Sequence, residues 1–160
     1  MDEEATIPPG QRYFEDYRVG MVCEFGDVAL TANEIVEFAR RYDPQAIHVD
    51  PAAAAQGAFG GLIASGWHTG SLMMRLFVEH FLSKVAALAS PGIDELRWVR
   101  PVRPGDRMRV RVTVLEANRS RSKPDRGMVR TFVEVLNQND DVVMSMTPMN
   151  LFRCRPRRMA

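Results

Sequence analysis

The stretch "SGWHTGSLMMRLFVEHFL", residues 65 to 82, decides the fold of this chain. Its apolar residues recur at spacings of three, four and seven, a pattern typical of a helix that buries one wide face. The stripe runs on beyond residue 82 and consists of Trp67, Gly70, Met73, Met74, Phe77, Val78, Phe81, Leu82 and Val85. Charged residues are absent before Arg75, so we expect the first half of the helix to be the more deeply buried. Such a helix needs a partner layer that covers its apolar face.

That layer is predicted further along the chain, where the apolar period changes to two. In residues 107–114, four apolar residues alternate with arginines and a threonine, the signature of a half-exposed antiparallel strand. After the turn residues 90–92, strands are also expected at 95–101, 128–136 and 142–152, with a weaker one at 21–30. Gly26 marks a bulge in the weak strand, and Pro148 predicts a sheet edge or a bulge in the last one.

Together these elements predict an α+β protein, in which a curved antiparallel β-sheet wraps around one long central α-helix. The chain has 160 residues, 46% of them hydrophobic and 26% charged, so one core accounts for most of it. We therefore expect a single domain over residues 1–160. Its core spans about residues 12–153, between an irregular N-terminal leader and a basic C-terminal tail.

Composition also limits the classes of binding partner and the cellular compartment that we expect. The formal net charge of +1 argues against nucleic acid or a membrane as a partner. The acidic start "MDEEATIPPG" has no apolar run, so no secretory signal is expected. Residues 51–74 carry no charge, but glycines and polar residues interrupt them. Cys23 and Cys154 match no metal or redox spacing, so we expect a cytoplasmic protein without a metal site.

Basic residues are nevertheless unevenly placed. Between Arg97 and Arg130 the chain has eleven arginines or lysines and only three acidic residues. A local excess of this size suits a small polyanionic ligand. The alternative is a solvated strand face that is rich in arginine.

Two helices are predicted ahead of the long one. Thr31 and Glu34 form a capping box, and the apolar residues that follow predict a helix that ends near Asp43, because Pro44 disfavours helical backbone in the residue before it. Asp50 is well placed to cap a short helix that begins at Pro51.

The segment "YDPQAIHVD", residues 42 to 50, joins these helices and carries candidate chemistry. Asp43 and His48 could project into one cleft and hold a water between them. An imidazole exchanges protons near neutral pH, and a carboxylate supplies a second site of proton exchange. The alternative is that Asp43 caps the preceding helix or forms an Asx-turn, and that His48 is a hydrogen-bonded loop histidine.

The start of the long helix is the second candidate. The N–H of Gly66 is a first-turn amide, which together with the helix dipole could stabilise an oxyanion; close packing also explains a glycine here. His68 could donate a hydrogen bond near such a site or be a core histidine. Met73 and Met74 could line an acyl pocket or belong to the core. Ser65 lacks the flanking glycines of a nucleophile elbow, so a serine hydrolase is not expected.

Residues of about 12–153 resemble the MaoC-like dehydratases, or (R)-specific enoyl-CoA hydratases, of the hot-dog fold. The resemblance rests on "YDPQAIHVDPAAA", "FGGLIASGWHT" and "LRWVRPVRPGDRMRV". The family's catalytic aspartate and histidine have four residues between them and fall on Asp43 and His48. Its oxyanion glycine, eighteen residues after the histidine, falls on Gly66. The chain departs from the common motif at Gln45 and Ala46, where Asn-Pro is usual, and at Met74, where a serine is frequent.

The resemblance implies a homodimer or dimer of dimers, with an acyl-CoA substrate entering at the subunit interface. No separate cofactor is implied, because coenzyme A arrives as part of the thioester. Implied substrate contacts near the reacting atoms are Ser65, Trp67, His68, Met73 and Met74. Implied contacts to the coenzyme A phosphates are Arg97, Arg100 and Arg103, with Lys123 and Arg126 as weaker candidates.

The resulting hypothesis is reversible hydration of a trans-2-enoyl-CoA to the (R)-3-hydroxyacyl-CoA, a hydro-lyase reaction. One alternative is a dehydratase of a branched or dicarboxylic, mesaconyl-type acyl-CoA. Another is a non-catalytic acyl-CoA-binding subunit. A hot-dog thioesterase is less favoured, since the long helix carries no acid before Glu79.

Overall fold

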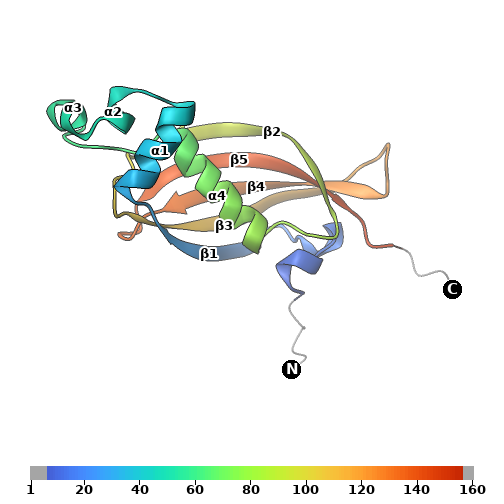
Figure 1. The fold of residues 1–160 in the computed structure, drawn as a ribbon. Coiled ribbons are helices and arrows are strands. Elements are labelled where there is room, and N and C mark those ends of the chain that lie inside the picture. The colour runs from blue at the N-terminus through green and yellow to red at the C-terminus, as the bar shows by residue number, and fades with distance from the viewer. Residues whose placement is uncertain (1–6, 157–160) are drawn as a thin grey trace.

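Five strands form one antiparallel sheet in the computed structural model, which describes residues 7–156. Their order in the sheet is β1-β3-β4-β5-β2. The strands are β1 (Val22–Ala29), β2 (Ala87–Trp98), β3 (Arg107–Arg119), β4 (Arg126–Leu136) and β5 (Val142–Arg153). The long helix α4 (Gly66–His80) lies across one face of the curved sheet (Figure 1). The predicted α+β architecture is confirmed.

The core lies between α4 and the sheet. Alternate residues of β3 from Met108 to Val114 are fully buried, as the period of two predicts. They join Met73, Leu76 and Phe77 of α4 in one hydrophobic cluster. Burial of a large apolar side chain contributes about 1.5–3 kcal/mol, so this seam stabilises the whole domain.

A glycine lets the edge strand β1 close over the helix. Gly26 has φ +87°, and the pairing of β1 with β3 shifts register between Phe25 and Val28. A Cβ at Gly26 would lie 2.7 Å from Cδ1 of Leu76. The predicted bulge is therefore confirmed, and it also brings β1 backbone against α4.

Two expected boundaries were wrong. Helix α4 ends at His80 with Phe81 as its C-cap, so Leu82 and Val85 are not part of the helical stripe. Strand β2 starts at Ala87 and includes residues 90–92, after which the strand was expected to begin. Of the two alternatives for Pro148, the sheet edge is wrong, because β5 lies between β4 and β2. Its pairing with β4 stops at Met149 and resumes at Met146, without a change of register.

Short N-terminal and C-terminal segments pack together. The leader contains the 3-10 helices η1 (Pro9–Gln11) and η2 (Phe14–Asp16), and Arg155 forms an ion pair of 2.7 Å with Asp16. The remainder of the predicted leader and tail, residues 1–6 and 157–160, lies outside the described residues. None of the described helices is long and apolar enough to cross a membrane.

Three helices gather at one end of α4: α1 (Ala32–Tyr42), α2 (Ala46–Val49) and α3 (Pro51–Gln56) (Figure 1). The capping box of Thr31 and Glu34 is confirmed. Asp50 caps α3 as predicted, accepting hydrogen bonds from the N–H groups of Ala52 and Ala53. Helix α2 was not predicted, and it carries His48.

Candidate active site

Asp43 ends α1 and turns its carboxylate toward the start of α4. Its N–H donates to Ala39 O at 2.8 Å, which makes Asp43 the C-cap. Gln45 Nε2 donates to Oδ1 at 2.6 Å, and Ser65 Oγ donates to Oδ2 at 2.7 Å. These two hydrogen bonds, the Gln45 bond first, hold the pKa of Asp43 below its ordinary value. The carboxylate is therefore ionised at neutral pH.

His48 faces this carboxylate from α2. Its side chain is buried, with 5% of the residue surface exposed, and its Nδ1 lies 2.7 Å from Ile63 O. A carbonyl oxygen only accepts, so Nδ1 carries the proton and neutral His48 presents a free lone pair at Nε2. That Nε2 lies 3.4 Å from Asp43 Oδ2. Two acceptors at this distance need a shared proton or a bridging water.

Gly66 is the first residue of α4, and its N–H has no acceptor within the helix. Among the described residues, none accepts a hydrogen bond from this N–H. Ser65 caps the helix by accepting from Trp67 N at 3.3 Å, while its hydroxyl proton goes to Asp43. Ser65 therefore links the carboxylate to the helix start. It is fully buried, which places it behind Asp43 and not on an open binding surface.

Trp98 is a site residue that the sequence reasoning missed. A Cβ at Gly66 would lie 2.2 Å from Cε2 of Trp98, so the indole packs directly on the glycine. Trp67 meets the same indole edge-on, with ring centroids 5.1 Å apart. Both tryptophans remain largely exposed. Their apolar surface borders the free amide, and close packing of Gly66, the alternative considered from the sequence, is present as well. The available signal was an aromatic residue at the end of an edge strand.

The other predicted contacts on α4 differ in accessibility. His68 is buried and stacks on Phe38, with centroids 4.5 Å apart, and its pKa is lowered by burial. It is therefore neutral at pH 7, and its Nδ1 has no partner among the described residues. Met73 belongs to the core at 3% exposure, whereas Met74 is 42% exposed on the outer face. The two methionines do not line one pocket.

The arginines expected to hold phosphates are engaged within the chain. Arg97 pairs with Glu95 at 2.7 Å, and Arg100 pairs with Asp141 at 3.5 Å. Arg103 donates to Phe59 O at 2.6 Å. Other arginines of the basic stretch are also paired with carboxylates, namely Arg107, Arg109, Arg111, Arg119, Arg126 and Arg130. The local excess of positive charge is thus largely offset in the folded protein.

The chain is similar in sequence and fold to several known proteins. A MaoC-like dehydratase from Rhodospirillum rubrum has a similar structure, with a TM-score of 0.85 and 39% identity over 91% of this chain and 99% of that one. The 3-hydroxyacyl-thioester dehydratase Z of Mycobacterium tuberculosis is 36% identical over 68% of this chain and 73% of that protein. The (R)-hydratase PhaJ1 of Pseudomonas aeruginosa shares the fold, with a TM-score of 0.69 and 24% identity over 92% of this chain and 91% of that one.

Residues 16–139 match the family model described as the MaoC like domain. That match covers both Asp43 and His48, as well as Gly66 at the start of α4. The chain therefore belongs to the MaoC-like family of hot-dog hydratases and dehydratases.

Proposed function

We propose that this protein reversibly hydrates a trans-2-enoyl-CoA to the (R)-3-hydroxyacyl-CoA. The observation that carries the proposal is the 3.4 Å approach of His48 Nε2 to Asp43 Oδ2, with Ser65, the N-cap of α4, donating to the same carboxylate beside the free N–H of Gly66. The MaoC-like family assignment and the hydratase and dehydratase relatives support a hydro-lyase.

In the proposed reaction, a water beside the pair forms hydrogen bonds to both His48 Nε2 and Asp43 Oδ2. Since Nδ1 of His48 keeps its proton for Ile63 O, Nε2 is the free base that accepts a proton from the water. Asp43 accepts the second hydrogen bond of that water and orients it. As the water oxygen bonds to C3 of the enoyl group, a proton is delivered to C2 from the imidazolium, which restores neutral His48.

Gly66 N–H would donate to the thioester oxygen while that oxygen carries enolate-like charge. One such donor contributes about 3 kcal/mol to a developing oxyanion. The positive end of the α4 dipole adds to the same stabilisation. No metal or redox cofactor enters the proposed reaction.

The test is loss of crotonyl-CoA absorbance, measured for wild type and Asp43→Asn. We expect the substitution to lower kcat by about 10²–10⁴-fold, because the water loses its orienting carboxylate. Asp50→Asn is the matched control. Asp50 is a nearby acid that only caps α3, and asparagine caps a helix equally well. Equal rates for wild type and Asp43→Asn would contradict the mechanism.

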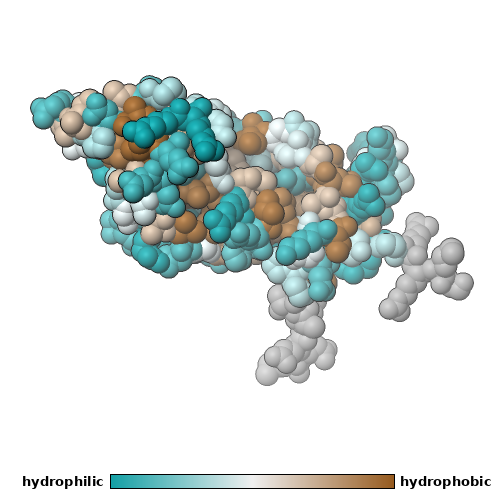
Figure 2. Space-filling view, viewed as in Figure 1, coloured by the Kyte–Doolittle hydropathy of each residue, from teal (hydrophilic) through white to brown (hydrophobic). Residues whose placement is uncertain are grey.

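The proposed active form is a homodimer. The outer face of α4 exposes Trp67, Met74 and Val78, which lie at spacings of seven and four along the helix. Strand β2 ends the sheet with an unpaired edge that exposes Ile93 and Trp98. Apolar surface, interrupted by polar residues, lies over the face that carries α4 (Figure 2). A second copy covering this surface would also enclose the open side of the site at Gly66.

A further inference from the structure

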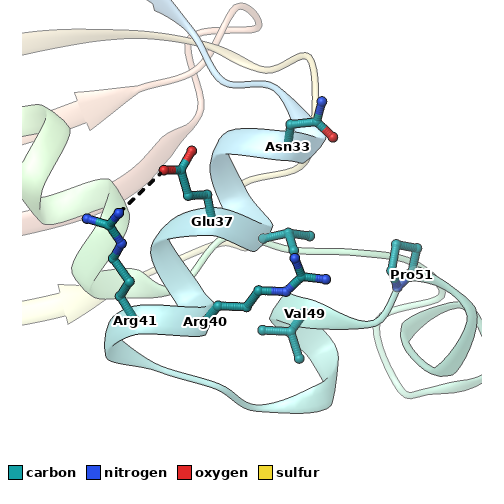
Figure 3. Close-up of a pocket in the computed structure, with 7 residues that line it drawn as sticks. Asn33, Glu37, Arg40, Arg41, Val49 and Pro51 are labelled. Atoms are coloured by element: carbon teal, nitrogen blue, oxygen red, sulfur yellow. Dashed lines mark ion pairs between the residues drawn. The ribbon is translucent and has the colours of Figure 1, made fainter.

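A groove of about 590 Å³ lies between α1 and the segment formed by α2 and α3. This volume is in the range of small-molecule sites. Its lining residues come from all three helices and are Asn33, Val36, Glu37, Arg40, Arg41, Val49 and Pro51. Figure 3 shows Arg40 extending across the space between α1 and the chain at Val49 and Pro51.

The groove adjoins the catalytic loop but is distinct from the Asp43 and His48 site. Arg41 stands two residues before Asp43, and Val49 directly follows His48. The His48 side chain points inward to Ile63 O, whereas Val49 lines the groove. A ligand in this groove would therefore lie beside the helix that carries the catalytic histidine.

The positive charge in this groove is available to a ligand. Within the part of the chain that the structure describes, Arg40 pairs with no carboxylate. Arg41 has only a 3.9 Å contact with Glu37, and both of these side chains are exposed (Figure 3). An ion pair of that kind contributes little. Arg97, Arg100 and Arg103 lie closer to their partners in the chain, at 2.7, 3.5 and 2.6 Å.

The remaining lining matches the other parts of a nucleotide. Val36, Val49 and Pro51 supply apolar surface on which a flat base can lie. Asn33 can donate and accept hydrogen bonds. A guanidinium beside them is suited to a phosphate, which it binds in a bidentate manner.

We propose that this groove binds the adenosine phosphate end of coenzyme A, with Arg40 as the main phosphate contact. This inference rests on the proposed function, which identifies coenzyme A as the carrier of the acyl group. It moves the phosphate site from the basic stretch after Arg97 to the outer face of α1. In this proposal the pantetheine arm runs from the groove past the segment of His48 and Val49 to the reacting atoms near Gly66.

A carrier protein fits the same groove less well. Acidic protein surfaces are bound by extended basic patches, and the arginines of the strands are paired with carboxylates. The concave shape also favours a small nucleotide over an acidic helix.

The first test measures binding of free coenzyme A by calorimetry, which needs no turnover. We expect Arg40→Gln to weaken the affinity about tenfold, a size typical of a lost hydrogen bond to a charged group. Arg121→Gln is the matched control, since Arg121 is an exposed arginine in the loop between β3 and β4, at the other end of the sheet (Figure 1). It should bind coenzyme A like the wild type, and thermal unfolding should confirm that both variants fold.

The second test compares crotonyl-CoA with crotonyl N-acetylcysteamine, which lacks the nucleotide. We divide kcat/KM for crotonyl-CoA by kcat/KM for crotonyl N-acetylcysteamine. This ratio should fall about tenfold in Arg40→Gln and stay at the wild-type value in Arg121→Gln. Turnover of the truncated thioester tests the proposed hydration alone. Coenzyme A binding that is absent in wild type, or equal in wild type and Arg40→Gln, overturns the groove assignment.

Discussion

Gln45 shows how one substitution in a motif changes the environment of a catalytic group. The family's common motif has asparagine at this position, and the longer glutamine side chain reaches back to Asp43 Oδ1 at 2.6 Å. Its backbone carbonyl also accepts from His48 N at 2.9 Å, so one residue contacts both members of the pair. The sequence marked this position as a departure, but only the structure shows which atoms it joins.

Replacing Gln45 by alanine should raise the pKa of Asp43. The Gln45 bond is the largest cause that lowers this pKa, so its loss moves the pKa up toward the ordinary value. The side-chain carboxyl carbon of Asp43 should therefore titrate at higher pH in Gln45→Ala, as followed by NMR, while activity at pH 7 falls less than about tenfold because the carboxylate stays ionised. Gln56→Ala, at the exposed end of α3, is the control and should leave this titration unchanged. An unmoved titration in Gln45→Ala would show that the Gln45 bond does not lower the pKa of Asp43.

At the level of elements, the contact of β1 with α4 depends on a missing side chain. Gly26→Ala must place a Cβ both at φ +87° and 2.7 Å from Leu76 Cδ1. We expect a loss of about 2–4 kcal/mol in the free energy of unfolding, measured by urea denaturation. Gly105→Ala isolates the backbone cost, because Gly105 has φ +88° with no atom within 4 Å of its Cβ position. It should lose only about 1 kcal/mol. Equal losses would mean that Leu76 gives way freely.

Strong periodicity predicted the central elements well, and local chemistry predicted the caps. The long helix, the alternating strand β3 and the capping residues Thr31 and Asp50 each follow from patterns of a few neighbouring residues. The wrong boundaries follow from distant contacts. Residues 90–92 read as a turn, but Gly92 pairs with Met149 across 57 residues of sequence. Pro148 is tolerated in an interior strand because the pairing with β4 is interrupted opposite it.

On the scale of the whole molecule, the predicted site is assembled from residues of separate elements. Asp43, His48 and Gly66 were predicted as site residues from spacing and resemblance. In the structure His48 Nε2 lies 3.4 Å from Asp43 Oδ2, and Ser65, which precedes Gly66, donates to the same carboxylate. Trp98 was missed because its contact with Gly66 depends on how β2 ends beside α4. The ion pairs of the basic stretch also could not be predicted from the sequence. Their acidic partners Glu24, Asp27 and Asp94 lie on other strands, far away along the chain.

A charge on the exposed face of α4 should separate the proposed dimer. Met74→Glu would bury a carboxylate against the partner subunit, so its mass by light scattering at micromolar concentration should fall to that of a monomer. Leu115→Glu is the matched control, because Leu115 on β3 is also 42% exposed and lies outside the proposed interface. A dimeric Met74→Glu, or a monomeric wild type, would contradict the proposed assembly.

The buried hydroxyl of Ser65 has a consequence for how this protein can evolve. The Ser65 hydroxyl accepts a hydrogen bond from Trp67 N–H in the first turn of α4 and donates one to Asp43. A substitution at position 65 must therefore preserve both hydrogen bonds. Threonine is the one substitution that keeps a hydroxyl on Cβ, where a single oxygen can both donate and accept. We therefore expect random mutagenesis with selection for activity to recover threonine and almost nothing else at position 65, while the neighbouring exposed positions drift freely.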